Sequence, residues 1–143
     1  MRRLFAYGTL GIPEIAQALT GRFWPAERAV LEGFARYRVR GESFPGIVSA
    51  PGARTAGVLY AGVDARSLVL LDRFEGKLYE RREVWVCAGE GTRIAALTYV
   101  VGPRCRRRLG REPWDRRRFE ARHLGAYLAH CAQLRRAARR LRS

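Results

Sequence analysis

Glycine and proline break this chain into short apolar segments, and this feature limits the fold more than any other. Breaks at Gly41, at Pro51-Gly52 and at Gly89-Glu90-Gly91 separate segments with the length and composition of β-strands. The strands we expect cover residues 3–8, 28–40, 45–49, 55–63, 80–87 and 93–101. The helices we expect cover residues 13–19, 64–72 and 115–141. Many short strands with few helices indicate an α+β domain.

The size of the chain suits one hydrophobic core. With 143 residues and 48% hydrophobic content, we expect a single domain over residues 1–143, and we find no internal repeat. No apolar run approaches the roughly 20 residues that span a bilayer. The run after Arg2-Arg3 is too short for a signal peptide. Free thiols without a secretory signal lead us to expect a reducing, cytoplasmic location.

One carboxylate, Glu75, is placed between two regular elements. The apolar residues before it have helical spacing, with Asp64 as a plausible N-cap and Gly76 where the helix would end in a left-handed conformation. From Arg82 onward, Val84, Val86 and Ala88 alternate with Glu83, Trp85 and Cys87, as in a strand. Glu75 is therefore expected on the turn between a helix and a strand.

The local sequence leaves two interpretations of Glu75 open. It is either a functional carboxylate or a surface group paired with Arg73 or Arg81. Asp72 is the competing carboxylate, and helix capping or a salt bridge explains it more simply.

The N-terminal segment from Leu4 to Gly11 is a second informative stretch. An apolar strand leads directly into Gly8 and Gly11. Because glycine permits unusual backbone conformations, several N–H groups can converge after such a strand and bind an anion or a developing oxyanion. Taken alone the pattern is also that of an ordinary turn, and it matches neither a dinucleotide-binding nor a phosphate-binding glycine loop.

Together, the Tyr7-Gly8-Thr9-Leu10 turn and the Asp72-x-Phe74-Glu75-Gly76-x-x-Tyr79-x-Arg81 segment resemble the γ-glutamylcyclotransferase-like superfamily, most closely its γ-glutamylamine cyclotransferase branch. The likeness covers roughly residues 4 to 128 and fades in residues 129–143. Further matching motifs are Phe44-Pro45-Gly46-Ile47-Val48, Gly57-Val58-Leu59-Tyr60, Thr98-Tyr99-Val100, Trp114, Phe119, His123-Leu124 and Tyr127. The resemblance implies a small barrel-like mixed β-sheet flanked by a few helices; the arginine-rich C-terminal helix is expected from the sequence pattern alone.

The resemblance also implies a reaction that needs no cofactor. In this family the α-amine of a γ-glutamyl group attacks its own γ-carbonyl, which forms 5-oxoproline and expels an amine. Glu75 matches the family's catalytic glutamate, which serves as general acid/base. The backbone amides around Gly8, Thr9 and Leu10 match the loop that binds the glutamyl group. The substrate implied is a small γ-glutamyl amine or peptide.

By the same resemblance Tyr7, Tyr79 and Tyr99 are candidates for the substrate pocket. Each has an alternative, since tyrosine is a common half-buried core residue and Tyr7 could simply pack under the turn. Apolar walls formed by Phe74, Tyr7 and Tyr79 are expected to raise the pKa of Glu75.

Other chemistries find little support. His123 and His130 lie seven residues apart on an expected helix, and no cysteine or carboxylate completes a metal set, so we expect no metal. The cysteines Cys87, Cys105 and Cys131 lack CxxC spacing, and their odd number argues against a full disulfide framework. Cys131 falls on the apolar side of the helix and is expected in the core. A serine-hydrolase elbow is also missing.

The C-terminal segment is strongly basic. Residues 104–143 hold 14 arginines against three carboxylates, a net +11 of the chain's +15. The expected helix has one apolar stripe, formed by Phe119, Leu124, Tyr127, Leu128, Cys131 and Leu134. Its arginines would then face water. A second interpretation is therefore a noncatalytic domain of the same fold that binds nucleic acid or an acidic protein through its arginine-rich C-terminus. Such contact would be sequence-independent and salt-sensitive.

Overall fold

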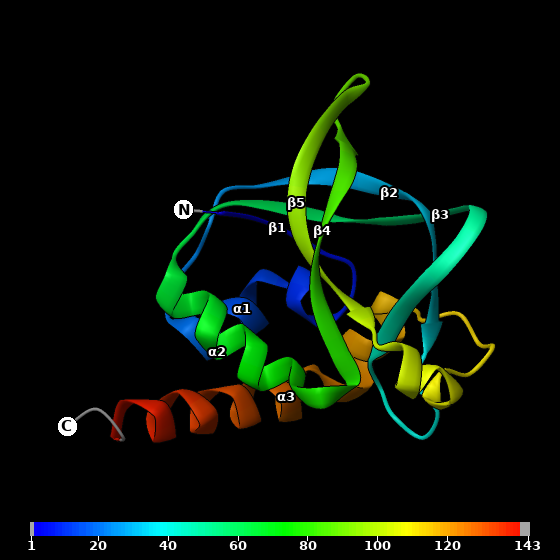
Figure 1. Ribbon diagram of the computed structural model, residues 1–143. Coiled ribbons are helices and arrows are strands. Elements are labelled where there is room, and N and C mark those ends of the chain that lie inside the picture. Colours follow the sequence, from blue (N-terminus) through cyan, green and yellow to red (C-terminus); the bar gives the residue numbers. More distant parts are fainter. Residues whose placement is uncertain (1, 141–143) are drawn as a thin grey trace.

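The computed structural model describes residues 2–140 (Figure 1). The strands are β1 (Arg2–Ala6), β2 (Ala26–Arg38), β3 (Pro45–Val63), β4 (Tyr79–Ala88) and β5 (Thr92–Val101). The α-helices are α1 (Pro13–Thr20), α2 (Ala65–Glu75) and α3 (Arg116–Arg140), and short 3-10 helices are η1 (Thr9–Gly11), η2 (Gly76–Leu78) and η3 (Pro103–Arg108). The expected α+β class and the C-terminal helix are confirmed; residue 141 of that predicted helix lies outside the described residues.

The strands form a closed barrel in the order β1-β3-β2-β4-β5. Most neighbouring strands are antiparallel, and the parallel pairing of β1 with β5 at Leu4 and Leu97 closes the ring. The barrel-like mixed sheet expected from the resemblance is thus confirmed. The three α-helices gather on one side of the barrel, and α3 runs beneath the other two (Figure 1).

One predicted break in the sheet is wrong. Residues 45–49 and 55–63 were expected as two strands, whereas β3 runs unbroken from Pro45 to Val63. The Pro51-Gly52 signal marks an irregularity instead, because the pairing partner of β2 jumps from Arg54 to Ser49 between Glu32 and Phe34. Gly52 has a φ of 84° there, so the glycine bends the strand without ending it.

Helix α2 begins where the sequence predicted and ends later. Asp64 is its N-cap and accepts a hydrogen bond from the backbone N–H of Ser67 at 3.1 Å. The helix continues three residues beyond the predicted end at residue 72, so that Glu75 is its last residue. Gly76 stops it with a φ of 70° and a ψ of −156°, a conformation that essentially only glycine adopts.

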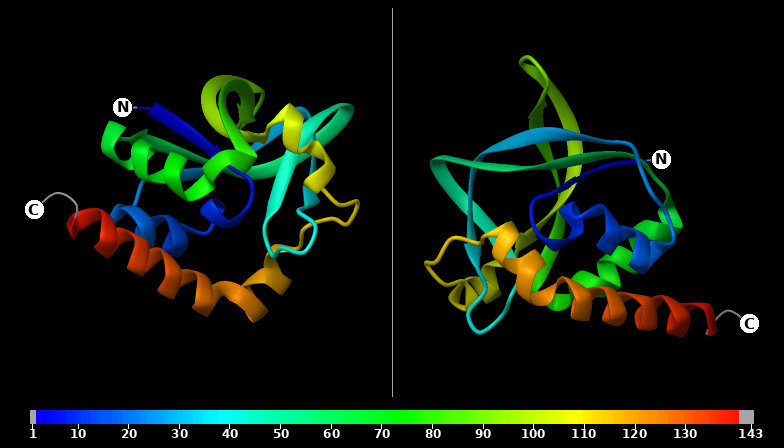
Figure 2. Two further views of the ribbon diagram at one scale, coloured as in Figure 1. Left: turned by 60° about the horizontal axis from the view of Figure 1, so that its bottom comes forward. Right: turned by 180° about the vertical axis from the view of Figure 1, so that it is seen from behind.

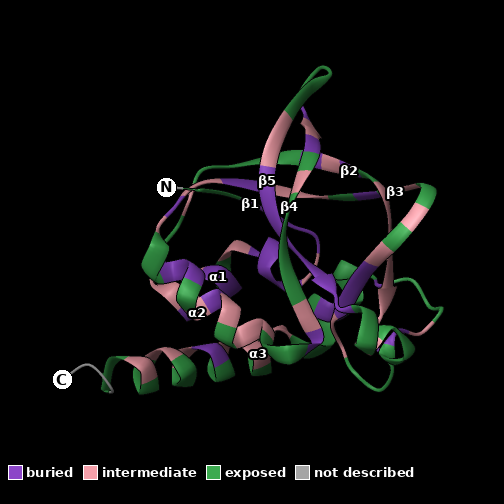
Figure 3. Cartoon of the chain, viewed as in Figure 1, coloured by how far each residue is buried: buried purple, intermediate pink, exposed green. Residues whose placement is uncertain are grey.

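The apolar stripe of α3 packs against the core, as predicted, except at its end. Phe119 and Cys131 are buried, while Leu134 is 36% exposed (Figure 3). The rest of the helix surface, with most of its arginines, faces solvent. No helix within residues 2–140 combines the length and the apolar character needed to cross a membrane.

Candidate active site

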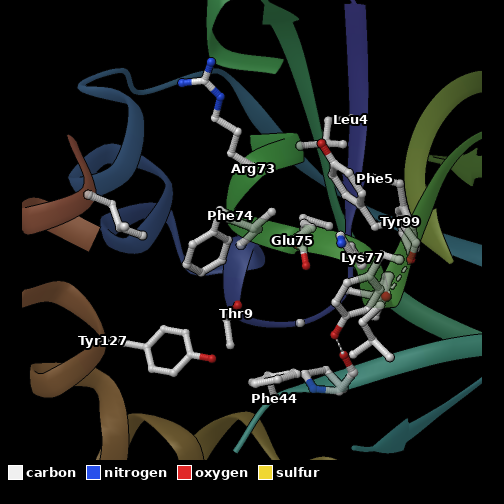
Figure 4. A pocket seen from close by; sticks show the side chains of 18 of the residues that line it. Leu4, Phe5, Thr9, Phe44, Arg73, Phe74, Glu75, Lys77, Tyr99 and Tyr127 are labelled. Atoms are coloured by element: carbon white, nitrogen blue, oxygen red, sulfur yellow. Dashed lines mark hydrogen bonds between the residues drawn. The ribbon is translucent and has the colours of Figure 1, made fainter. Parts of the chain in front are cut away.

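A cavity of about 540 Å³ lies between the barrel and the helices. Its walls come from the turn after β1, the end of α2, the start of β4 and the middle of α3 (Figure 4). All of the site residues proposed from the sequence line this cavity. They are Tyr7, Gly8, Thr9, Leu10, Glu75, Tyr79 and Tyr99.

Glu75 projects into the cavity from the last turn of α2 (Figure 4). Within residues 2–140 its carboxylate forms no ion pair, so the surface pairing with Arg73 or Arg81 is not formed. Burial, and next the nearby charge of Asp72, together raise the pKa of Glu75 from 4.5 to about 8. A carboxyl group with such a pKa exchanges protons near neutral pH.

Asp72 has the structural role that the sequence suggested. Its Oδ2 lies 3.0 Å from the guanidinium of Arg81, and its Oδ1 accepts a hydrogen bond from the Tyr99 hydroxyl at 2.7 Å. These bonds occupy Asp72 and fix Tyr99 in the cavity wall. Asp72 is therefore a paired carboxylate and Glu75 an unpaired one, and their environments differ accordingly.

Tyr7 and Tyr79 donate their hydroxyl protons to the protein itself. The Tyr7 hydroxyl donates to the Tyr99 carbonyl at 2.6 Å, and the Tyr79 hydroxyl donates to the Pro45 carbonyl at 2.6 Å. Burial, and next the charge of Glu75, raises the pKa of both phenols, so they remain protonated. The Tyr7 oxygen also accepts a hydrogen bond from the backbone N–H of Ile47, so each hydroxyl offers a ligand only its remaining acceptor capacity and no proton.

The turn after β1 is tightly packed. A β-carbon at Gly8 would lie 2.6 Å from Cγ of Pro45, so only glycine fits there. The following residues form η1, and the hydroxyl of Tyr60 donates to the Leu10 carbonyl at 2.7 Å. As in any first helical turn, the N–H groups of Thr9 and Leu10 form no hydrogen bond within the described chain.

Arg36 supports this turn from the opposite side. Its guanidinium donates to the carbonyl of Tyr7 at 2.7 Å and to that of Ala56 at 3.0 Å. It also lies 5.6 Å from the ring of Trp114, whose indole N–H donates to the Ser43 carbonyl at 2.8 Å. Burial lowers the pKa of Arg36 from its usual value. The turn is thus held on both sides by side chains from distant parts of the sequence.

Comparison with known proteins agrees with this geometry. The family model described as "Gamma-glutamyl cyclotransferase, AIG2-like" matches residues 4–116. The chain belongs to this family. Among its relatives, AIG2-like protein C of Arabidopsis thaliana is 34% identical over 98 residues, which cover 68% of this chain and 57% of that protein. Protein AIG2 C of the same plant is 33% identical over 98 residues, covering 68% of this chain and 59% of that protein. The matched part therefore spans well under two thirds of these relatives.

Solved structures share the AIG2-like fold. A solution structure of an Arabidopsis thaliana protein has a TM-score of 0.69 at 27% identity, covering 93% of this chain and 81% of the other. An AIG2-like protein from Mus musculus has a TM-score of 0.57 at 25% identity, covering 80% of this chain and 88% of the other. A structure described as a gamma-glutamyl cyclotransferase has a TM-score of 0.60 at 23% identity, covering 71% and 66% of the two chains, and supports the fold alone.

In this AIG2-like protein several cavity residues had no predicted site role. Among them are Phe44, Arg108, Tyr127, His130 and Leu134. Figure 4 shows the phenol of Tyr127 directed toward the cavity from α3. Burial raises its pKa, although a hydrogen bond from the Ser43 side chain acts in the opposite direction. Phe44 and Tyr127 belong to the motifs matched in the sequence, but no local signal assigned them to the cavity, and the residues of α3 reach it only when that helix packs under the barrel.

Metal-ligating side chains do not cluster in this member of the family. No group of three or more His, Cys, Asp or Glu side chains gathers within residues 2–140. Cys131 is fully buried, as predicted for a core residue, and the three cysteines are free thiols. His123 is exposed and has its ring 5.9 Å from that of Phe119.

Proposed function

We propose that this protein is a γ-glutamyl cyclotransferase that releases 5-oxoproline and an amine from a γ-glutamyl amine or peptide. The observation that carries the proposal is Glu75, a single unpaired carboxylate whose pKa is raised to about 8 inside the family's cavity. Membership of the AIG2-like γ-glutamyl cyclotransferase family supports the reaction class.

The proposed reaction is an intramolecular acyl transfer. The α-amine nitrogen forms a bond to the γ-carbonyl carbon, and the bond from that carbon to the leaving nitrogen breaks. Both groups belong to one molecule, so the enzyme needs only to fold the substrate and manage its charges; effective molarities of such reactions reach about 10⁵–10⁸ M. Glu75 takes the proton released by the attacking amine and returns one to the leaving amine.

The oxyanion and the ammonium need opposite partners. The N–H groups of Thr9 and Leu10 have no partner within the described chain and are assigned to the developing oxyanion, with Gly8 allowing the close approach. The oxygen atoms of Tyr7 and Tyr79 retain acceptor lone pairs, which suit the substrate's α-ammonium. Tyr99, held by Asp72, completes the wall beside them.

The test is product analysis with a substrate panel. Purified protein is incubated with γ-glutamyl dipeptides, γ-glutamyl-ε-lysine and simple γ-glutamyl amines, and both 5-oxoproline and free glutamate are quantified by mass spectrometry. The proposal expects 5-oxoproline and amine in equal amounts, with no glutamate. Matched α-glutamyl dipeptides are the control, since their cyclisation releases no amine. Glutamate as the main product would instead indicate hydrolysis and contradict the proposal.

A second candidate function rests on the arginines of residues 104–140. Most of them are exposed, and in α3 Arg116 forms an ion pair with Glu120 at 3.0 Å. This surface favours diffuse contact with a polyanion. Retention on immobilised nucleic acid should then fall steeply with salt. Retention that is unchanged at high salt would contradict this candidate.

A further inference from the structure

A second, smaller cavity adjoins the C-terminal part of α3, next along the helix from Leu134 of the Glu75 cavity. Its volume is about 200 Å³, and it lies where the end of α1, the start of α2 and the C-terminal half of α3 meet (Figure 2). Four arginines from these three regions line it: Arg22, Arg66, Arg135 and Arg139. Among the residues 2–140 that line it, Asp64 is the only one with a carboxylate.

Asp64 is already occupied by the local structure. One oxygen accepts the N–H of Ser67 at 3.1 Å, and the other accepts the Ser67 hydroxyl at 2.7 Å. Within residues 2–140, none of the four arginines forms an ion pair shorter than 4.0 Å. The cavity therefore concentrates positive charge beside one described carboxylate, which caps α2 and whose pKa, against the effect of burial, is lowered by the Ser67 hydrogen bonds and also by the nearby charge of Arg22.

Arg135 packs against the C-terminal end of α1. Its guanidinium lies against Gly21, where an added β-carbon would be 2.5 Å from Nη2 and 2.6 Å from Cζ. Gly21 has a φ of 77° at the C-terminal end of α1. Arg135 is half-buried there, and its charge suits the negative end of the α1 dipole. This arginine therefore has a sufficient structural explanation.

Arg139, in the last turn of α3, also suits the negative end of its own helix, whereas Arg66 is not explained by helix stability. Arg66 lies in the first turn of α2, where a positive charge opposes the helix dipole. Two like charges about 4 Å apart repel each other by about 1 kcal/mol even in water. An anion bound among them would remove both penalties.

We propose that this cavity binds a phosphate group. A guanidinium presents a planar pair of N–H donors that matches two phosphate oxygens, and Arg is favoured over Lys wherever such bidentate contact is made. The cavity also includes the start of α2, where the positive end of the helix dipole adds to the attraction for an anion. A small phosphorylated molecule and the backbone of a nucleic acid share this chemistry.

The test compares two double variants that remove the same charge. Arg66→Gln with Arg139→Gln removes two exposed arginines from the cavity. Arg117→Gln with Arg118→Gln removes two exposed arginines from the other end of α3. Binding of inorganic pyrophosphate is measured by calorimetry on the full chain at low salt, after urea unfolding has shown that each variant is folded.

The proposal expects the cavity variant to lose about 10-fold or more in pyrophosphate affinity, because a hydrogen bond to a charged group contributes about 1.5–3 kcal/mol. The control should lose less than about threefold, since its arginines act only through long-range, screened charge. Equal losses in the two variants, or no binding by wild type at millimolar pyrophosphate, would overturn it.

A second arm uses a short single-stranded DNA to identify the source of the phosphate. A larger loss of DNA affinity in the cavity variant than in the control supports the site and assigns it to a nucleic-acid backbone. Equal DNA losses, together with a selective pyrophosphate loss, support the site and assign it to a small phosphorylated molecule.

Discussion

Replacing Glu75 by Gln should change how the stability of the protein depends on pH. The pKa of Glu75 is about 8 in the folded protein against an ordinary value of 4.5. Between these two values the folded state keeps the proton that the unfolded state releases. The free energy of unfolding that Glu75 contributes is therefore fully present below about pH 4.5 and is lost as the pH rises through about 8.

The size of the effect follows from the shift. A difference of 3.5 pKa units corresponds to a ceiling of about 5 kcal/mol at about 1.4 kcal/mol per unit. Because the cavity is open to water, which screens the charge, we expect roughly half of this, about 2–3 kcal/mol between about pH 5 and pH 8. Glutamine has the same shape and no charge, so Glu75→Gln should lack this part of the slope.

The assay is urea unfolding of wild type and variant at each pH unit from about 5 to about 9. The difference in free energy of unfolding between the two proteins should grow with pH in favour of Glu75→Gln, since all other groups cancel. Glu32→Gln, which removes an exposed carboxylate on β2, is the matched control and should run parallel to wild type. Parallel curves for Glu75→Gln and wild type would refute the burial of an unpaired carboxylate.

Three further predictions concern activity. If ionised Glu75 is the base, kcat/KM for 5-oxoproline release should rise about tenfold per pH unit up to about pH 8 and then level off; a flat profile from pH 6 to pH 9 would contradict this. Gly8→Ala should clash with Pro45, which lowers the free energy of unfolding by about 1–3 kcal/mol and raises KM. Urea unfolding and steady-state kinetics that match wild type would show that the turn is not packed tightly enough to require glycine. Arg36→Met should lower kcat/KM about 10–100-fold, because the turn after β1 loses its support. Arg38→Met, on the same strand but paired with an exposed glutamate, is the control and should not lower it. Similar losses in both variants would argue against a specific positioning role of Arg36.

The sequence predicted best those elements whose ends are marked by capping or turn residues. Asp64 marks the start of α2 because an N-cap needs a side-chain acceptor. Gly76 marks its end because the backbone there has a positive φ that favours glycine. The position of Glu75 at the end of this helix followed from the same signals. The Pro51-Gly52 signal misled, because in a bent barrel strand glycine and proline can mark an irregularity in pairing as well as an end.

Long-range contacts could not be predicted from the sequence. Arg36 reaches the Tyr7 carbonyl only because β2 pairs with β3 along its whole length, and Tyr127 enters the cavity only through the packing of α3. The hydroxyls of Tyr79 and Tyr99 were expected in the pocket, but their acceptors, Pro45 and Asp72, lie in other elements. Hydrogen-bond partners of this kind depend on the complete fold.

The most direct test of the proposed function is the rate of 5-oxoproline release by Glu75→Gln beside wild type and Glu32→Gln, with a γ-glutamyl substrate that wild type accepts. A general base contributes about 10²–10⁴-fold, so release by Glu75→Gln should fall by that factor while its folding remains intact and Glu32→Gln keeps the wild-type rate. Release by folded Glu75→Gln within about threefold of wild type would contradict the central role of this carboxylate.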